Sequence, residues 1–90
     1  MLVRNMTSSK GNLVPNQFII STPEYRAFQS YSSIIVKTTF VDGERVVYLD
    51  NDTWDYSNTT RKYRNMFLGE TSKEIKKKIK DGVYKLEDLN

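Results

Sequence analysis

The sequence predicts an α+β domain in which an antiparallel sheet of four to five short strands is followed by two C-terminal helices packed on it. Residues 17–50 contain short runs of β-branched and aromatic side chains separated by turn residues, which is the pattern of strands. Residues 58–80 instead show apolar side chains at helical spacing, with capping residues at the ends. A chain of 90 residues forms one domain with a small core.

The predicted strands follow a polar N-terminal segment. Residues 1–15 are expected to form a polar arm or edge strand, and residues 16–90 the single α+β domain. Strands are predicted at 17–22, 25–31, 34–41 and 45–50, and Val3 and residues 83–86 are candidates for further short strands. Asp42-Gly43 joins two of these strands by a two-residue turn, because both residues tolerate positive φ. The hairpin around this turn is the strongest local prediction.

Two helices are predicted after the sheet. The first begins near Asn58 or Thr59 and ends before Gly69, which is placed to adopt the left-handed conformation after a helix. The second begins at a capping box formed by Thr71 and Glu74 and runs to Lys80. We expect both helices to pack on the sheet through their apolar stripes.

The residues that the chain lacks exclude several kinds of chemistry. It has no cysteine and no histidine, which removes thiolate nucleophiles, most zinc sites and the usual general base at neutral pH. Asp50, Asp52 and Asp55 resemble the start of a calcium loop, but Asp55 and Arg61 stand where that loop needs glycine and glutamate. We therefore expect a protein that is not an enzyme and has no cofactor and no metal site.

Positive charge is concentrated in the C-terminal part of the chain. Eight cationic and two acidic side chains give residues 61–80 a net charge of +6, while the rest of the chain carries −3. Four lysines span about 100° of the second helix, opposite its two isoleucines: Lys73, Lys76, Lys77 and Lys80. This face predicts contact with phosphates or with an acidic protein surface, and a merely solvated helix face is the alternative.

A second candidate site lies between residues 54 and 64. It combines aromatic, hydroxyl and cationic side chains: Trp54, Tyr56, Thr59, Thr60, Arg61, Lys62 and Arg64. Cations in the first turn of a helix are unfavourable unless an anion binds there, so Thr59–Lys62 is a candidate anion site. In the alternative, Asp55 pairs with Arg61 or Lys62 and Ser57 or Asn58 caps the helix. The aromatic rings either stack on a base or fill the core.

The same stretch is similar to a sequence block found in a family of small proteins. With its WDYS-x-TT-x-KY-x(3)-FLG block, residues 54–69, the chain resembles a family of small uncharacterised proteins of bacteriophages and prophages, over roughly residues 16–89. The resemblance implies a phage accessory protein that is made in the cytoplasm of a bacterial host. No catalytic or ligand-binding residue is carried over from it.

These observations lead to three functional expectations. The first is a non-enzymatic phage accessory protein that inhibits or modulates a host nucleic-acid-handling defence system, in the manner of an anti-CRISPR protein, by binding a host protein or nucleoprotein complex. The second is direct binding of DNA or RNA, and the third is a pocket that sequesters a phosphorylated nucleotide. The N-terminus has no signal peptide and no segment is long and apolar enough for a membrane span, so no membrane partner is expected.

Overall fold

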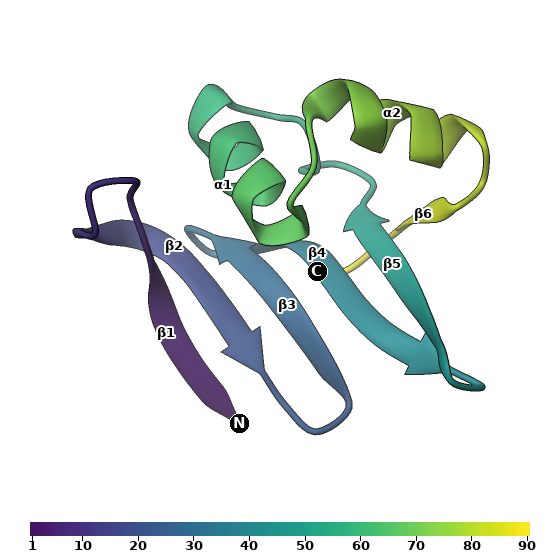
Figure 1. Cartoon of the computed structure of the whole chain (residues 1–90), viewed down its shortest axis with the longest axis horizontal. Helices are drawn as coiled ribbons and strands as arrows, with labels where there is room; N and C mark the ends of the chain where they lie inside the picture. The colour runs from purple at the N-terminus through teal and green to yellow at the C-terminus, as the bar shows by residue number, and fades with distance from the viewer.

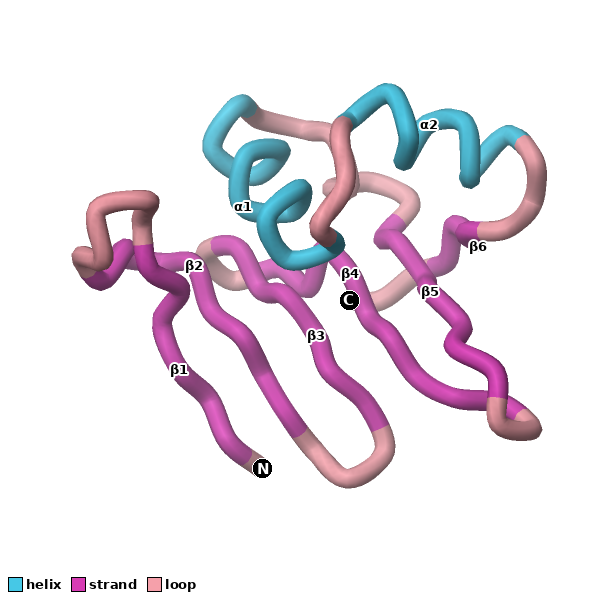
Figure 2. The backbone as a smooth tube through the Cα atoms, in the orientation of Figure 1, coloured by secondary structure: helices cyan, strands magenta, loops and turns pink.

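Six strands and two helices make up the fold in the computed structural model, which describes all residues 1–90 (Figure 1). The strands are β1 (Leu2–Thr7), β2 (Leu13–Ser21), β3 (Tyr25–Ser30), β4 (Ser33–Val41), β5 (Glu44–Asp50) and β6 (Tyr84–Glu87). The helices α1 (Asn58–Leu68) and α2 (Ser72–Lys80) lie between β5 and β6 in the chain. Both cover the same face of the sheet (Figure 2). The expected α+β class is confirmed.

The sheet is larger than expected and is not purely antiparallel. Its strand order follows the chain from β1 to β6. The pairs from β1–β2 to β4–β5 are antiparallel, whereas β6 runs parallel to β5. The prediction of four to five antiparallel strands is therefore wrong in size and in strand direction. The last strand is parallel because α1 and α2 carry the chain back across the sheet before β6 begins.

The N-terminal strands contain an irregularity that the sequence did not predict. β2 begins at Leu13, earlier than expected, and runs through Pro15 and Asn16. Asn16 has a φ of 65°, and the register between β1 and β2 shifts in the same region, after Asn5. An irregularity of this kind lets a strand continue past a proline, which cannot donate to the ladder. β1 is first in the strand order and therefore forms one edge of the sheet.

The predicted turn and helix ends are confirmed. Asp42 and Gly43 have φ values of 52° and 82°, the positive pair that a type I′ turn requires. The side chain of Ser57 accepts a hydrogen bond at the start of α1, and Gly69, with a φ of 68°, ends that helix. These are local features, which is why a short stretch of sequence was sufficient to predict them.

The capping box at the start of α2 is also confirmed. The Thr71 hydroxyl accepts a hydrogen bond from the backbone N–H of Glu74, and the Glu74 carboxylate accepts one from the backbone N–H of Thr71. The hydrogen bond from the Thr71 backbone N–H, together with one from the Thr71 hydroxyl to the same carboxylate, lowers the pKa of Glu74. The box therefore holds α2 in a defined position above the sheet.

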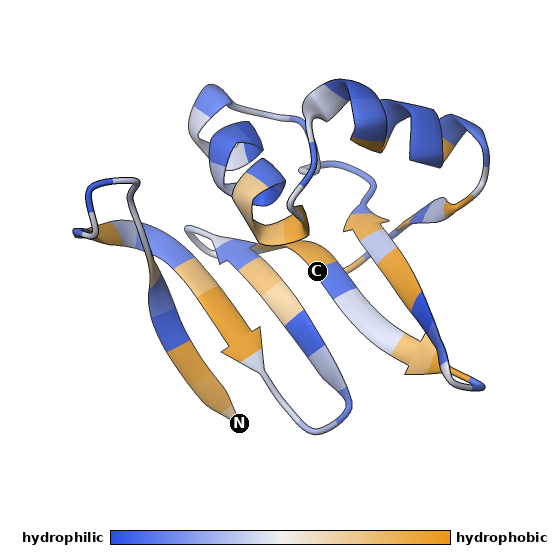
Figure 3. Ribbon diagram, viewed as in Figure 1, coloured by the Kyte–Doolittle hydropathy of each residue, from blue (hydrophilic) through white to orange (hydrophobic).

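The core lies between the helices and one face of the sheet (Figure 3). Phe28 of β3 stacks on Phe67 of α1, with the ring centroids 6.1 Å apart. Ile35 lies at a register shift in β4, where it joins the core and is fully buried. The core side chains are Met6, Phe28, Ile35, Val36, Val47, Leu49, Tyr63, Leu68, Ile75 and Tyr84. Each helix thus contributes its apolar stripe to one contiguous core.

One buried polar side chain is left without a partner. Gln17 on β2 is fully buried, and neither polar atom of its amide makes a hydrogen bond. Its strand neighbour Ser30 bonds instead to Thr60 of α1, at 3.1 Å. An unpaired buried group costs about 1–3 kcal/mol, so this end of the core contributes less stability than an apolar one would.

Candidate functional site

The four predicted lysines lie on the exposed side of α2. Ile75, the fully buried residue of this helix, anchors it to the core. Lys73, Lys76, Lys77 and Lys80 are all exposed. Because the lysines and Ile75 occupy opposite sides of the helix, the packing that buries Ile75 also directs the cationic side chains outward. We call these four residues the α2 lysine face.

Three members of the α2 lysine face have no ion pair. Lys77 pairs with Asp81 at 2.7 Å, one helical turn away. Lys73, Lys76 and Lys80 form no salt bridge with any acidic side chain. The positive charge of this surface is therefore largely uncompensated within the chain, and it is available to an external anion.

Lys78 has a different role on the same helix. Its ammonium group pairs with the Glu70 carboxylate and lies over the Tyr84 ring, at 5.1 Å from the centroid. The hydrogen bond to Glu70 raises the pKa of Lys78. Burial, followed by the hydrogen bond to Glu70, raises the pKa of Tyr84. This cluster ties α2 to β6, so Lys78 is a structural residue and not part of the exposed face.

Arg64 is an internal residue that holds the two helices to the preceding loop. Its side chain is fully buried, and its guanidinium donates to the Trp54 carbonyl at 2.7 Å and to Asp55 Oδ1 at 3.1 Å. Two further bonds, to Asn65 Oδ1 and Ser72 Oγ, are each 2.9 Å long. Burial lowers the pKa of Arg64, while Asp55 opposes that change. This corrects the expectation that Arg64 contacts a ligand.

The start of α1 already has the negative charge that an external anion would supply. Asp55 Oδ1 lies 3.7 Å from Arg61 Nη1 as well as 3.1 Å from Arg64 Nη1. The Ser57 hydroxyl accepts from the Thr60 backbone N–H at 3.1 Å. Because the helix start is capped and Arg61 is paired, the geometry favours the alternative reading over an anion site at Thr59–Lys62.

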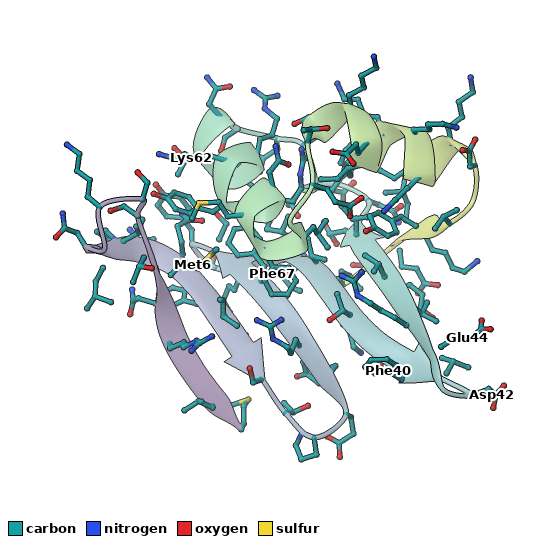
Figure 4. The ribbon with its side chains drawn as sticks, viewed as in Figure 1. Met6, Phe40, Asp42, Glu44, Lys62 and Phe67 are labelled. Carbon is teal, nitrogen blue, oxygen red and sulfur yellow. The ribbon has the colours of Figure 1, made fainter.

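The remaining residues of this block divide into buried and exposed groups. Thr60 is fully buried, which corrects its assignment as a ligand contact. Trp54 is half-buried and packs against the core, with the Arg64 guanidinium 5.3 Å from its ring centroid. Tyr56, Thr59 and Lys62 are exposed and remain available for binding, and Figure 4 shows Lys62 on the outer side of α1.

Asp50, the last residue of β5, organises the turn that follows the strand. Asp50 Oδ2 accepts from the Thr53 hydroxyl at 2.8 Å and from two backbone N–H groups of the turn. Asp50 Oδ1 accepts from the Leu89 N–H at 2.9 Å, so the same carboxylate holds the C-terminal tail against the sheet.

No group of three or more histidine, cysteine or acidic side chains is arranged to hold a metal ion. No helix meets the length and apolarity that crossing a membrane requires.

Asp50 makes stability depend on pH. Burial raises its pKa, but the hydrogen bonds led by that from Leu89 outweigh this effect and lower it. Because the folded-state pKa is depressed, the contribution is present above the ordinary pKa of aspartate and is lost as the pH falls through the folded-state value. We expect Asp50→Asn to cost about 1–3 kcal/mol at pH 7. We also expect the variant to lose less stability than the wild type below about pH 4.

Urea unfolding at pH 7 and at acidic pH measures both effects. Asp52→Asn is the matched control, since Asp52 is exposed and its side chain makes no hydrogen bond or ion pair. Equal pH profiles for Asp50→Asn and the wild type would show that the carboxylate of Asp50 does not carry the acid sensitivity.

The structure also reveals a groove that the sequence does not predict. Beside α1, it is lined by Arg4 and Met6 of β1, Arg26 of β3, and Met66 and Phe67 of α1. Its volume is about 700 Å³. One signal was readable in the sequence: two-residue alternation places Arg26 on the same side of β3 as the core residue Phe28. For residues 1–15 the sequence predicts only a polar arm or edge strand, and it indicates no site there.

Comparison with known proteins gives a family but no activity. No curated protein and no solved structure matches the chain significantly. The model of a family of unknown function, DUF8033, matches residues 1–82, which include both helices and the first five strands. The chain therefore belongs to this family of unknown function, DUF8033.

Proposed function

We propose that this chain is a non-enzymatic phage accessory protein that binds a host nucleic-acid-handling defence complex through its α2 lysine face and thereby blocks it sterically. One observation carries the proposal. Lys73, Lys76 and Lys80 are exposed and unpaired on one side of a helix whose other side is anchored by a buried isoleucine. A fixed row of uncompensated cations is suited to docking on an anionic surface.

The charge distribution supports binding through one side of the molecule. Residues 61–80 carry a net charge of +6, and the rest of the chain carries −3. Part of this positive charge is engaged within the fold, because Arg64 is buried and Arg61 and Lys78 form ion pairs. The unpaired lysines of the α2 lysine face supply most of the remainder at the surface. Lysines contact phosphate or carboxylate as point charges and do not read a base sequence. A steric inhibitor needs this kind of affinity, and it does not need sequence recognition.

The exposed part of the 54–64 block offers additional contacts. Tyr56 exposes 56% of its surface just before the start of α1, and Lys62 is exposed on that helix. Aromatic side chains at an interface often carry a large share of binding energy. Trp54, Thr60 and Arg64 support the block from within and are not part of this contact surface.

Direct binding of DNA or RNA is the second candidate, because the α2 lysine face would also attract a phosphate backbone. A nucleotide pocket in the 54–64 block is a weaker proposal. Thr60 and Arg64 are buried and Arg61 already pairs with Asp55, so the residues that would hold a phosphate there are engaged within the fold.

We expect Lys76→Gln/Lys80→Gln to reduce retention of the host complex about tenfold, since each lost exposed charge contact is worth up to about 1 kcal/mol. The measurement is an affinity pulldown from extract of the bacterial host, with and without nuclease. Lys10→Gln/Lys85→Gln removes the same charge from exposed positions outside the α2 lysine face and should bind normally.

The two candidate functions give different results in this experiment. A protein target stays bound after nuclease treatment. Direct nucleic-acid binding is lost with nuclease, and its affinity for a free oligonucleotide falls steeply as salt rises. Equal loss of retention in the two double variants would contradict both, because net charge and not this face would then determine binding.

A further inference from the structure

The groove beside α1 combines an apolar floor with cations. Met6 of β1, Ile19 of β2 and the two α1 residues Met66 and Phe67 supply the apolar surface. Figure 4 shows Met6 and Phe67 on the strand and helix that border it. The volume of about 700 Å³ is in the range of sites that accept several side-chain-sized groups. The apolar floor favours a ligand that brings apolar side chains, because contact removes both surfaces from water.

Two unpaired arginines lie at this groove. Arg4 and Arg26 both line it, both are exposed, and neither forms an ion pair or a side-chain hydrogen bond within the chain. The Arg26 guanidinium stacks on the Phe67 ring, 5.2 Å from its centroid, which orients it above the apolar floor. No acidic side chain lines the groove. The complementary ligand is therefore apolar and carries carboxylates.

The groove runs along an open edge of the sheet. β1 pairs with β2 on one side and has no strand partner on the other. An edge strand presents backbone N–H and C=O groups that can pair with an extended chain. Leu2 and Val3 of this edge are 62% and 51% exposed, and they precede the register shift that follows Asn5, so the first half of β1 is regular and contains no lysine or proline. A strand added here would place alternate side chains beside Arg4 and Met6.

We propose that the β1 edge and the groove together bind an extended acidic and apolar peptide segment of a partner protein, which adds a strand next to β1. Its apolar side chains enter the groove over Met66 and Phe67, and its carboxylates pair with Arg4 and Arg26. This surface is separate from the α2 lysine face and does not depend on it.

Charge favours this occupant over the alternatives. Antiparallel pairing of β1 with β1 of a second copy would bring two Arg4 side chains near each other, and like charges on neighbouring strands are destabilising. A nucleic acid would satisfy the arginines, but it would use neither the backbone groups of the edge nor an aliphatic floor formed by methionine and isoleucine. A peptide with both kinds of side chain uses all three features.

A synthetic peptide tests the proposal. The probe repeats Thr-Leu-Thr-Glu over eight residues, so that leucine and glutamate share one face of a strand. It is titrated into the ¹⁵N-labelled full chain, and amide shifts are followed by NMR. We expect shifts concentrated in β1 and at Met66 and Phe67. The same peptide with glutamine in place of glutamate should bind about tenfold more weakly.

A backbone-blocked peptide and arginine variants of the chain serve as further tests of the same binding. A peptide N-methylated at every residue has no backbone N–H on either edge to donate to β1 and should not bind. Arg4→Gln/Arg26→Gln should weaken binding of the acidic peptide at least about tenfold, with folding checked by its amide spectrum. Arg45→Gln, at another exposed arginine of the sheet, should leave binding unchanged.

Several outcomes would overturn the proposal. These are no shifts at millimolar peptide, equal binding of the glutamine or N-methylated peptide, or shifts centred away from β1. Concentration-dependent dimerisation through β1 would assign the edge to a second copy. Competition by an oligonucleotide for Arg4 and Arg26, with no peptide binding, would assign the groove to nucleic acid.

Discussion

Replacing Arg64 by methionine is expected to destabilise the fold by about 2–4 kcal/mol, since each buried polar group that loses its partner costs about 1–3 kcal/mol. The guanidinium is fully buried and joins the loop, α1 and α2 by bonds to Trp54, Asp55 and Ser72. Methionine fills much of the volume but donates no hydrogen bond. The Trp54 carbonyl would then lose its partner, and Ser72 Oγ would keep only the hydrogen bond from Asn65 Nδ2, which adds to the cost.

Chemical denaturation of the purified chain measures this effect. Arg61→Met is the matched control, because Arg61 also pairs with Asp55 but is partly exposed, and it should cost less than about 1 kcal/mol. Arg64→Lys should also be strongly destabilising, since an ammonium group cannot reproduce the planar set of bonds. A loss below 1 kcal/mol for Arg64→Met would show that Arg64 does not hold the helices in place.

Replacing Ile75 by alanine is the second large change, with an expected loss of about 2–5 kcal/mol. Ile75 is the fully buried residue of α2. The shortened side chain leaves a cavity between the helix and the sheet, and the surrounding core can fill it only in part. Because the same residue anchors the α2 lysine face, the variant should also weaken any binding that depends on a fixed helix.

Thermal and urea unfolding test the Ile75 variant. Lys76→Ala changes the next residue, which is exposed, and should alter stability by no more than about 0.5 kcal/mol. An Ile75→Ala variant as stable as the wild type would indicate that α2 is not packed as described.

The features that the sequence predicted well are those that depend on neighbouring residues. The Asp42-Gly43 turn needs positive φ at both positions, and the capping box needs Thr71 and Glu74 three residues apart. Gly69 marks the end of α1 for a similar reason. The exposed side of α2 also follows from helical spacing, once Ile75 is assigned to the core.

The features that the sequence did not predict depend on contacts between distant segments. The parallel pairing of β6 with β5 is set by the path of both helices, which no local pattern specifies. Arg64 looked like a surface cation, because nothing in its immediate sequence shows that Trp54, Asp55 and Ser72 converge on it. The groove requires β1 and α1 to be brought together, and these lie far apart in the chain.

Lysine acetylation read by mass spectrometry shows whether the α2 lysine face is the docking surface, and it requires no substituted residue. The chain is briefly acetylated alone and while bound to its target in nuclease-treated host extract. We expect binding to reduce acetylation of Lys73, Lys76 and Lys80 several-fold and to leave that of Lys10 and Lys85 unchanged. Equal acetylation of all five lysines in the free and bound states, or protection confined to Lys10 and Lys85, would contradict it.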